Sequence, residues 1–328
     1  DLVWVLGTDD RQDPLEKKSE QDAVLARLKR LGVHLRAPKL SSSSRYTREP
    51  KRPPIYFDGT VTDEQVAQFV EMKQEWAPLS TTGWTLWFIG SQITDASLDR
   101  LSQLNGISAL LFFDTDITDA GLSKIKDFKG LTVLYLSQPK VTDIGLANLK
   151  GAKQLRVLNV RGTLITAAGL EHLKGLQLTT LLIPDRIKTD LGLKYLADFM
   201  PERVALSLVD WEITDAGLVH LKELTNLQHL DLGATKITDA GLVHLKGLTV
   251  LRTLDLASTR ITDAGLVHLT GLGELRNLSV SGLPISDHGL VHLKRLTNLN
   301  SLTLRDTQIT DAGVADLKKS LPNCKITK

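Results

Sequence analysis

The stretch LRTLDLASTRITDAGLVHLT, residues Leu251–Thr270, decides the fold of this chain. Leu254 and Leu256 alternate as in a β-strand, whereas Leu266 and Leu269 are three residues apart, close to the period of a helix. The stretch therefore predicts a short strand, a turn and one helix, each with a single apolar face. Because such a unit cannot bury that face alone, neighbouring units must stack and share one core.

Copies of this unit recur at a spacing of 24 residues. The Ile-Thr-Asp core, or a close variant of it, begins at Ile93, Ile117, Val141, Ile165, Ile213, Ile237, Ile261, Ile285 and Ile309. The same spacing predicts strands centred near Leu86, Leu110, Leu134, Leu158, Leu181, Leu206, Leu230, Leu254, Leu278 and Leu302. The register breaks around Asp190, in the middle of the chain, where the changes in length fall between a helix and the next strand.

The consensus LxxLxLxxTxITDxGLxxLxxL resembles the leucine-rich-repeat family. Its short form is similar to the ITD-type repeats of F-box-associated recognition proteins and of bacterial repeat proteins. The resemblance covers the chain from about Ile55 to the C-terminus. It implies an α/β horseshoe-shaped solenoid with a parallel concave sheet and convex helices, which binds protein partners and carries out no chemistry. The chain departs from many relatives by placing Thr after the strand, at Thr115, Thr163, Thr235, Thr259 and Thr307.

We divide the chain into three parts. Residues 1–20 are polar beyond the first seven and are predicted to be flexible. Residues 21–54 are predicted to form an N-terminal cap, with a helix over 21–31, an edge strand over 33–35 and a basic, proline-rich loop. Residues 55–328 form the solenoid, with an insertion near 76–83 and a C-terminal cap from about residue 317.

Composition narrows the possible functions. The 328 residues carry a net charge of only +2, which gives no general attraction to nucleic acid. The basic loop is best read as a solvated linker, with attraction to anionic lipid as the alternative. The single cysteine, Cys324, excludes an internal disulfide. No long apolar run predicts a membrane span. The opening DLVWVLG is either the trimmed end of an export signal or anchor, or a short strand, and it leans the localisation toward an exported or membrane-anchored protein.

Two columns of polar residues, one of aspartates and one of histidines, recur at the repeat spacing and are candidate metal ligands. For the aspartates we favour a role at the helix N-terminus, beside a Thr N-cap, over cation binding. For the histidines we favour solvated side chains, because no acid or cysteine accompanies them at ligand spacing. We therefore expect no metal and no cofactor. The columns are Asp95, Asp119, Asp143, Asp215, Asp239, Asp263 and Asp311, and His172, His220, His244, His268 and His292.

No nucleophile, P-loop, zinc-protease or dinucleotide motif occurs in the sequence, so we do not expect an enzyme. The predicted concave face is more informative. Strand residues between the buried leucines point to that face. Its N-terminal third is aromatic and aliphatic, whereas its C-terminal half is small, polar and acidic. We predict that a protein or peptide partner binds to five apolar residues and to a polar rim formed by two more, which are Trp87, Ile89, Leu111, Phe113 and Tyr135, with Asp114 and Arg161.

Two segments of the chain itself could cover these apolar residues in place of a partner. Either the loop over residues 38–54 or the insertion over 76–83 would satisfy the same burial requirement by folding over them. The chain could also serve as a structural or assembly module, as the exported domain of an anchored protein, or as a subunit that recruits substrates to an enzyme.

Overall fold

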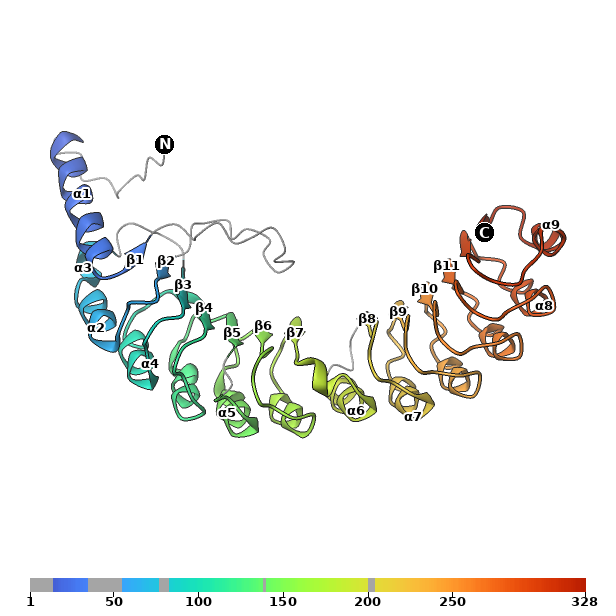
Figure 1. Cartoon of the computed structure of the whole chain (residues 1–328), viewed down its shortest axis with the longest axis horizontal. Helices are drawn as coiled ribbons and strands as arrows, with labels where there is room; N and C mark the ends of the chain where they lie inside the picture. Colours follow the sequence, from blue (N-terminus) through green and yellow to red (C-terminus); the bar gives the residue numbers. More distant parts are fainter. Residues whose placement is uncertain (1–13, 35–54, 77–82, 138–139, 200–203) are drawn as a thin grey trace. The chain divides into compact units, whose positions relative to one another are not determined.

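The chain forms a repeat structure of alternating strands and helices (Figure 1). It separates into two compact units, residues Asp1–Pro184 and Asp185–Lys328. This computed structural model describes residues 14–34, 55–76, 83–137, 140–199 and 204–328. The predicted fold class is confirmed in both units. The boundary between the units, after Pro184, lies in the region where the predicted repeat register breaks.

In the first unit, the described strands form one seven-stranded sheet in the order of the chain. The first two strands are antiparallel, and every later neighbour is parallel. The strands are β1 (Val33–His34), β2 (Ile55–Phe57), β3 (Trp84–Ile89), β4 (Ile107–Phe113), β5 (Val133–Ser137), β6 (Val157–Asn159) and β7 (Thr180–Leu182).

In the second unit, the described strands form a six-stranded parallel sheet, again in chain order. Leu254 lies between Leu230 and Leu278, so residues one repeat apart are direct neighbours. Every strand centre predicted from the repeat spacing is confirmed. The strands are β8 (Ala205–Ser207), β9 (His229–Asp231), β10 (Thr253–Asp255), β11 (Asn277–Ser279), β12 (Ser301–Thr303) and β13 (Lys325–Thr327).

The helix of each repeat is short, and in several repeats it is a 3₁₀-helix rather than an α-helix. The apolar residues of these segments are three apart, which suits three residues per turn. The α-helices of the repeats are α2 (Asp63–Glu71), α4 (Asp95–Leu101), α5 (Asp143–Asn148), α6 (Asp190–Phe199), α7 (Asp215–Leu218), α8 (Leu290–Leu293) and α9 (Asp311–Ser320). The 3₁₀-helices are η2 (Gly121–Asp127), η3 (Leu149–Gly151), η4 (Ala168–Leu173), η5 (Asp185–Ile187), η6 (Val219–Leu221), η7 (Gly241–Leu245) and η8 (Gly265–Leu269).

The N-terminal cap is longer than predicted. Helix α1 (Pro14–Arg30) begins before Gln21, so residues 14–20 are helical rather than part of a flexible segment. Gly32 follows the helix with a φ of 71°, which confirms it as the stop signal. Leu28 is buried but Leu25 is 38% exposed, so the cap covers only part of the apolar face of the helix. The first thirteen residues and the predicted loop over 38–54 lie outside the described residues.

Aromatic side chains fill the start of the core in the first unit. Phe57 stacks on Phe88 with a centroid separation of 4.2 Å, and Phe88 stacks on Phe112 at 5.3 Å. Trp76 closes this end, where α3 (Lys73–Trp76) places it at 4.5 Å from Phe69 and its indole N–H donates to the Phe69 carbonyl. The predicted insertion therefore begins with a buried anchor, while residues 77–82 lie outside the described part of the chain.

The C-terminal cap consists of α9 and β13. The helix begins at Asp311, before the predicted cap boundary near residue 317. Strand β13 continues the parallel sheet beside β12. Cys324 is buried just before this strand, and burial raises the pKa of its thiol. We interpret Cys324 as a packing residue of the cap.

Candidate functional site: an apolar strip on the inner face

The five apolar residues predicted to bind a partner come together on one face of the first sheet. We name this side of each sheet, opposite the buried leucines, the inner face. Trp87, Leu111 and Tyr135 are direct neighbours across three strands, and Ile89 lies beside Phe113. All five belong to one apolar cluster, which is separate from the leucine core. The repeat spacing therefore predicted their contact correctly.

The structure adds three members to this cluster, which are Tyr56, Ala109 and Val133. Tyr56 lies beside Trp87 in the strand pairing. A signal for it exists in the sequence, because Tyr56 stands between buried Ile55 and Phe57 just as Trp87 stands between two buried residues. We name the eight residues the apolar strip; they are Tyr56, Trp87, Ile89, Ala109, Leu111, Phe113, Val133 and Tyr135.

Exposure differs between the middle of the strip and its borders. Trp87 is 5% exposed and Leu111 is 6% exposed, although both lie on the inner face. Ile89, Phe113 and Tyr135 are only half-buried. Burial raises the pKa of the Tyr135 hydroxyl. The middle of the strip thus provides a packed base, while the border side chains remain accessible.

The indole N–H of Trp87 is buried and has no hydrogen-bond partner among the described residues. A buried donor of this kind costs about 1–3 kcal/mol, because it has lost its contact with water and gained no acceptor. The indole N–H of Trp76, in contrast, donates to the Phe69 carbonyl at 2.7 Å. The Trp87 donor is the polar feature of the strip that most needs an explanation.

A polar pair borders the strip at β1 and β2. His34 pairs with Tyr56 across the strands, and its Nε2 lies 3.0 Å from a carboxylate oxygen of Asp58. Partial burial alone would raise the pKa of Asp58, but hydrogen bonds from Thr60 and His34 outweigh this effect and hold that pKa below its usual value. Burial, together with the Asp58 charge, raises the pKa of Tyr56.

The two predicted rim residues lie next to the strip but outside its cluster. Asp114 follows β4 directly and is exposed, with a φ of 51°. Arg161 follows β6, is half-buried, and donates its backbone N–H to the Asn159 side chain at 3.0 Å. Their proposed contact with a partner remains a prediction.

The inner face of the second unit has a different chemistry. Asp231 and Asp255 are direct neighbours across β9 and β10. Burial, assisted by the charges of Asp255 and Asp210, raises the pKa of Asp231. The only large apolar inner-face side chain of the described residues here that is clearly exposed is Val209, at 38%.

The aspartate column connects successive repeats through hydrogen bonds. Asp239, for example, accepts hydrogen bonds from both the backbone N–H and the hydroxyl of Thr262 in the next repeat, at 2.8 and 2.6 Å. Thr262 in turn accepts from the Ala264 N–H. The predicted Thr N-cap is found where the repeat helix is an α-helix, at Thr94, Thr142, Thr214 and Thr310. We name the recurring arrangement the Asp–Thr ladder. Its aspartates are Asp63, Asp95, Asp119, Asp143, Asp190, Asp215, Asp239, Asp263 and Asp287.

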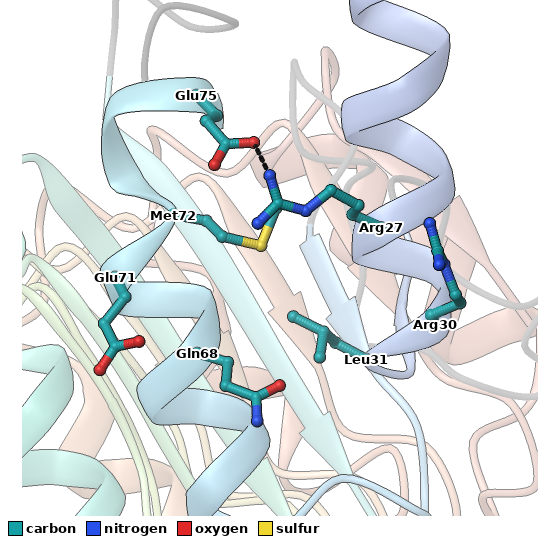
Figure 2. Close-up of a pocket in the computed structure, with 7 residues that line it drawn as sticks. All are labelled: Arg27, Arg30, Leu31, Gln68, Glu71, Met72 and Glu75. Carbon is teal, nitrogen blue, oxygen red and sulfur yellow. Dashed lines mark hydrogen bonds and ion pairs between the residues drawn. The ribbon is translucent and has the colours of Figure 1, made fainter.

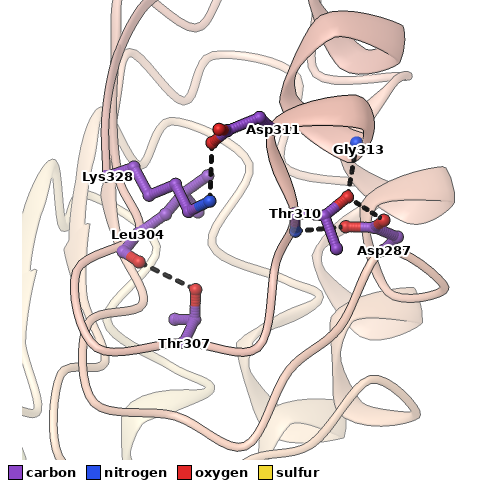
Figure 3. Close-up of polar contacts among 7 residues, drawn as sticks. All are labelled: Asp287, Leu304, Thr307, Thr310, Asp311, Gly313 and Lys328. Carbon is purple, nitrogen blue, oxygen red and sulfur yellow. Dashed lines mark hydrogen bonds and ion pairs between the residues drawn. The ribbon is translucent and has the colours of Figure 1, made fainter.

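Figure 3 shows the last step of this ladder. Asp287 accepts from the backbone N–H and the hydroxyl of Thr310, whose hydroxyl oxygen accepts from the Gly313 N–H. Asp311, at the next ladder position, instead pairs with Lys328 at 2.7 Å. The ladder thus ends on a lysine supplied by the C-terminal cap.

The five histidines of the second column lie on the helices of their repeats, half-buried or exposed. Within the described ranges, no group of three or more His, Cys, Asp or Glu residues could hold a metal ion. None of the helices in that part of the chain is long and apolar enough to cross a membrane.

A cleft of about 400 Å³ separates α1 from α2 and α3 (Figure 2). Arg27 spans it and pairs with Glu75 at 2.6 Å, above Met72 and Leu31. Both partners of this ion pair are well exposed, so it contributes little to stability. The cleft marks the place where the cap helix is only loosely packed on the first repeat.

Comparisons with known proteins agree with this architecture. Residues 223–245, 247–269 and 295–318 match a family model described as a leucine-rich repeat. Among solved structures, an internalin from Listeria monocytogenes is similar, with 24% identity and a TM-score of 0.50 over 76% of this chain and 81% of that one. No curated protein matches the sequence. The narrower resemblance to ITD-type and F-box-associated repeats stays a prediction. The chain carries leucine-rich repeats, and its fold is that of a leucine-rich-repeat solenoid.

Proposed function

We propose that this protein is a non-catalytic scaffold that binds a protein or peptide partner through the apolar strip of its first unit. The observation that carries the proposal is the contiguity of large uncharged side chains on a face that the leucine core does not use. Core packing alone requires only the opposite face of each strand. Contiguous apolar groups that are partly accessible on a protein surface commonly mark interaction sites.

The composition of the strip supports an interface. Aromatic side chains are enriched at the centres of interfaces, where a few of them supply most of the binding free energy. The half-buried Phe113 and Tyr135 are the accessible anchors, and the buried Trp87 and Leu111 hold them in place. Asp114 and Arg161 would then contribute specificity at the border.

The test uses the whole chain, immobilised and exposed to a phage-displayed library of random peptides. We expect selected peptides to be rich in large apolar residues. Phe113→Ala and Tyr135→Ala should each weaken their binding by about tenfold or more, as truncation of an interface anchor does. Isothermal titration calorimetry measures the dissociation constants, and thermal unfolding checks that the variants fold.

The matched control is Val209→Ala. Val209 occupies the inner-face position of Phe113, but in the second unit, and it is exposed. This variant should bind the selected peptides within about twofold of the parent protein. The proposal fails if the library yields no binder, or if folded Phe113→Ala and Tyr135→Ala variants bind as well as the control.

A further inference from the structure

The unpaired donor in the apolar strip indicates what kind of partner the strip accepts. We infer that the strip binds an extended peptide segment, which places a backbone carbonyl oxygen against Nε1 of Trp87 and a large uncharged side chain over Ile89 and Phe113. This inference rests on the function proposed above and specifies the chemistry of its partner.

In the free chain, Trp87 is shielded from solvent. Its side chain is 5% exposed, and its Nε1 atom is buried with no acceptor in the described part of the chain. A donor that is withheld from water favours any bound state in which it gains an acceptor. Binding an acceptor-bearing ligand therefore recovers free energy that the free protein has lost.

A ligand must be able to reach the indole N–H of Trp87. Tyr56 and Leu111 lie on either side of Trp87 in the strand pairing. Leu111 is buried, but Tyr56 is half-buried and stands on the three-residue strand β2. Of these two neighbours, Tyr56 is the one that can change rotamer without moving a buried side chain. We therefore assign Tyr56 as the side chain that turns aside on binding.

The uncharged composition of the apolar strip determines the charge of the ligand that it accepts. All eight residues of the apolar strip are uncharged. A carboxylate or phosphate brought to Trp87 would lose its water and meet no cation within the strip, which costs more than one hydrogen bond returns. A neutral carbonyl is desolvated more cheaply, and every peptide backbone supplies it. The acceptor is thus a peptide carbonyl rather than an anionic group.

The width of the apolar strip sets the length of the bound peptide segment. Neighbouring strands lie about 4.8 Å apart, so the four strands β2–β5 present a strip about 14 Å across. An extended peptide advances about 3.3 Å per residue, so about four residues cross the strip. A segment of this length carries enough apolar surface to cover Ile89 and Phe113 while its backbone reaches Trp87.

The experiment uses the whole chain and synthetic peptides selected from the random library. Trp87→Phe keeps an aromatic ring and removes the donor. We expect it to weaken peptide binding by about tenfold, which corresponds to one desolvated hydrogen bond. The matched control is Trp211→Phe, which makes the same change at a buried tryptophan of the second unit and should leave the affinity within about twofold.

A second readout requires no variant in the complex. In ¹H–¹⁵N spectra, the indole resonance of Trp87, assigned from its loss in Trp87→Phe, should move downfield when peptide saturates the parent protein. An unmoved resonance, or equal affinities of Trp87→Phe and Trp211→Phe, overturns this inference while leaving the proposed function standing. Failure to select any peptide is a different outcome, because it removes the proposed function itself.

Discussion

At the scale of single residues, the turn after the strand requires the same left-handed backbone conformation at one position of many repeats. Residues at one repeat position adopt a positive φ, between 51° and 79°, whether or not they are glycine. Asp tolerates this left-handed conformation fairly well, but a residue such as Ala pays roughly 1–2 kcal/mol for it. The column consists of Gly90, Asp114, Gly162, Asp210, Ala234, Ser258, Gly282 and Asp306.

This column predicts an unusual effect for a substitution to glycine. Ala234→Gly should raise the free energy of unfolding by about 0.5 kcal/mol, because relief of the left-handed conformation exceeds the entropic cost of glycine. The reverse change at the same repeat position, Gly162→Ala, should lower it, since the new Cβ would also lie 2.7 Å from the Ser137 hydroxyl oxygen. Urea unfolding measures both variants. A less stable Ala234→Gly protein would contradict this account of the turn.

A second residue-scale prediction concerns the carboxylates of the second unit. Asp231→Asn should stabilise the protein by about 0.5 kcal/mol at neutral pH, because it removes a like-charge pair across neighbouring strands. The Asn side chain can still accept the Gly233 N–H, which now bonds to Asp231 at 3.0 Å, just as Asn159 accepts the N–H of Arg161.

The effect of Asp231→Asn should depend on pH. The folded-state pKa of Asp231 is raised, so its ionisation costs stability above that pKa and costs nothing when the group is protonated in both states. The gain should therefore vanish as the pH falls below about 4. Unfolding curves at pH 7 and pH 3 test this, and an equal gain at both values would exclude charge repulsion as the cause.

At the scale of elements, much of the repeat could be predicted from the sequence, because strands and helices follow from the spacing of leucines. The Thr N-cap and the Asp position were also predictable from local rules. The Asp–Thr ladder was not predicted, since its partners belong to different repeats and no local rule joins them. Gly265 was predicted to allow a close backbone approach in the tight turn. The group that approaches was not predicted; it is the Asp239 carboxylate of the preceding repeat, with which a Cβ at Gly265 would collide.

The candidate site was predictable to a similar degree. The repeat spacing predicted the contact of Trp87, Leu111 and Tyr135, because residues 24 apart lie opposite each other on neighbouring parallel strands. It did not show that Trp87 and Leu111 would be nearly buried, since burial depends on how the neighbouring inner-face side chains fill the space. The unpaired indole donor is likewise a property of the packed structure.

The ladder predicts strong coupling between Asp239 and Gly265. Asp239→Ala should cost about 1–3 kcal/mol, since it leaves the Thr262 N–H without its acceptor. Gly265→Ala should be at least as costly in the parent protein, because of the collision with that carboxylate. In the Asp239→Ala background, however, the same Gly265→Ala change should cost much less. A double-mutant cycle by urea unfolding measures the coupling, and additive effects would refute the assigned contact.

At the scale of the whole molecule, each unit carries the same ladder, but their inner faces differ. The first unit presents the apolar strip, and the second presents a polar and acidic surface. A repeat architecture permits this division, because the leucine core fixes one side of every strand and leaves the other side free to vary. We therefore assign the proposed binding of a partner to the first unit.

Two aspartates of the ladder, Asp63 and Asp287, make the molecule sensitive to acid. Partial burial would raise the pKa of Asp63, but hydrogen bonds from Ser97 and Thr94 outweigh it, and those from Thr310 lower the pKa of Asp287. A lowered folded-state pKa adds stability above the unfolded-state value, and this stability is lost as the pH falls through the folded-state value. The urea concentration at the midpoint of unfolding should therefore decrease as the pH is lowered below about 4. Asp63→Asn should flatten that fall, whereas an unchanged midpoint down to pH 3 would contradict the ladder's contribution.

The most direct test of the central claim is a map of amide and indole chemical shifts across the whole chain as a selected peptide is added. We predict the largest changes at Tyr56, Trp87, Phe113 and Tyr135, with resonances of the second sheet, such as those of Ser207 and Asp255, nearly unmoved. Changes centred on the second sheet, or on the repeat helices, would show that the partner binds elsewhere and that the apolar strip is not the binding surface.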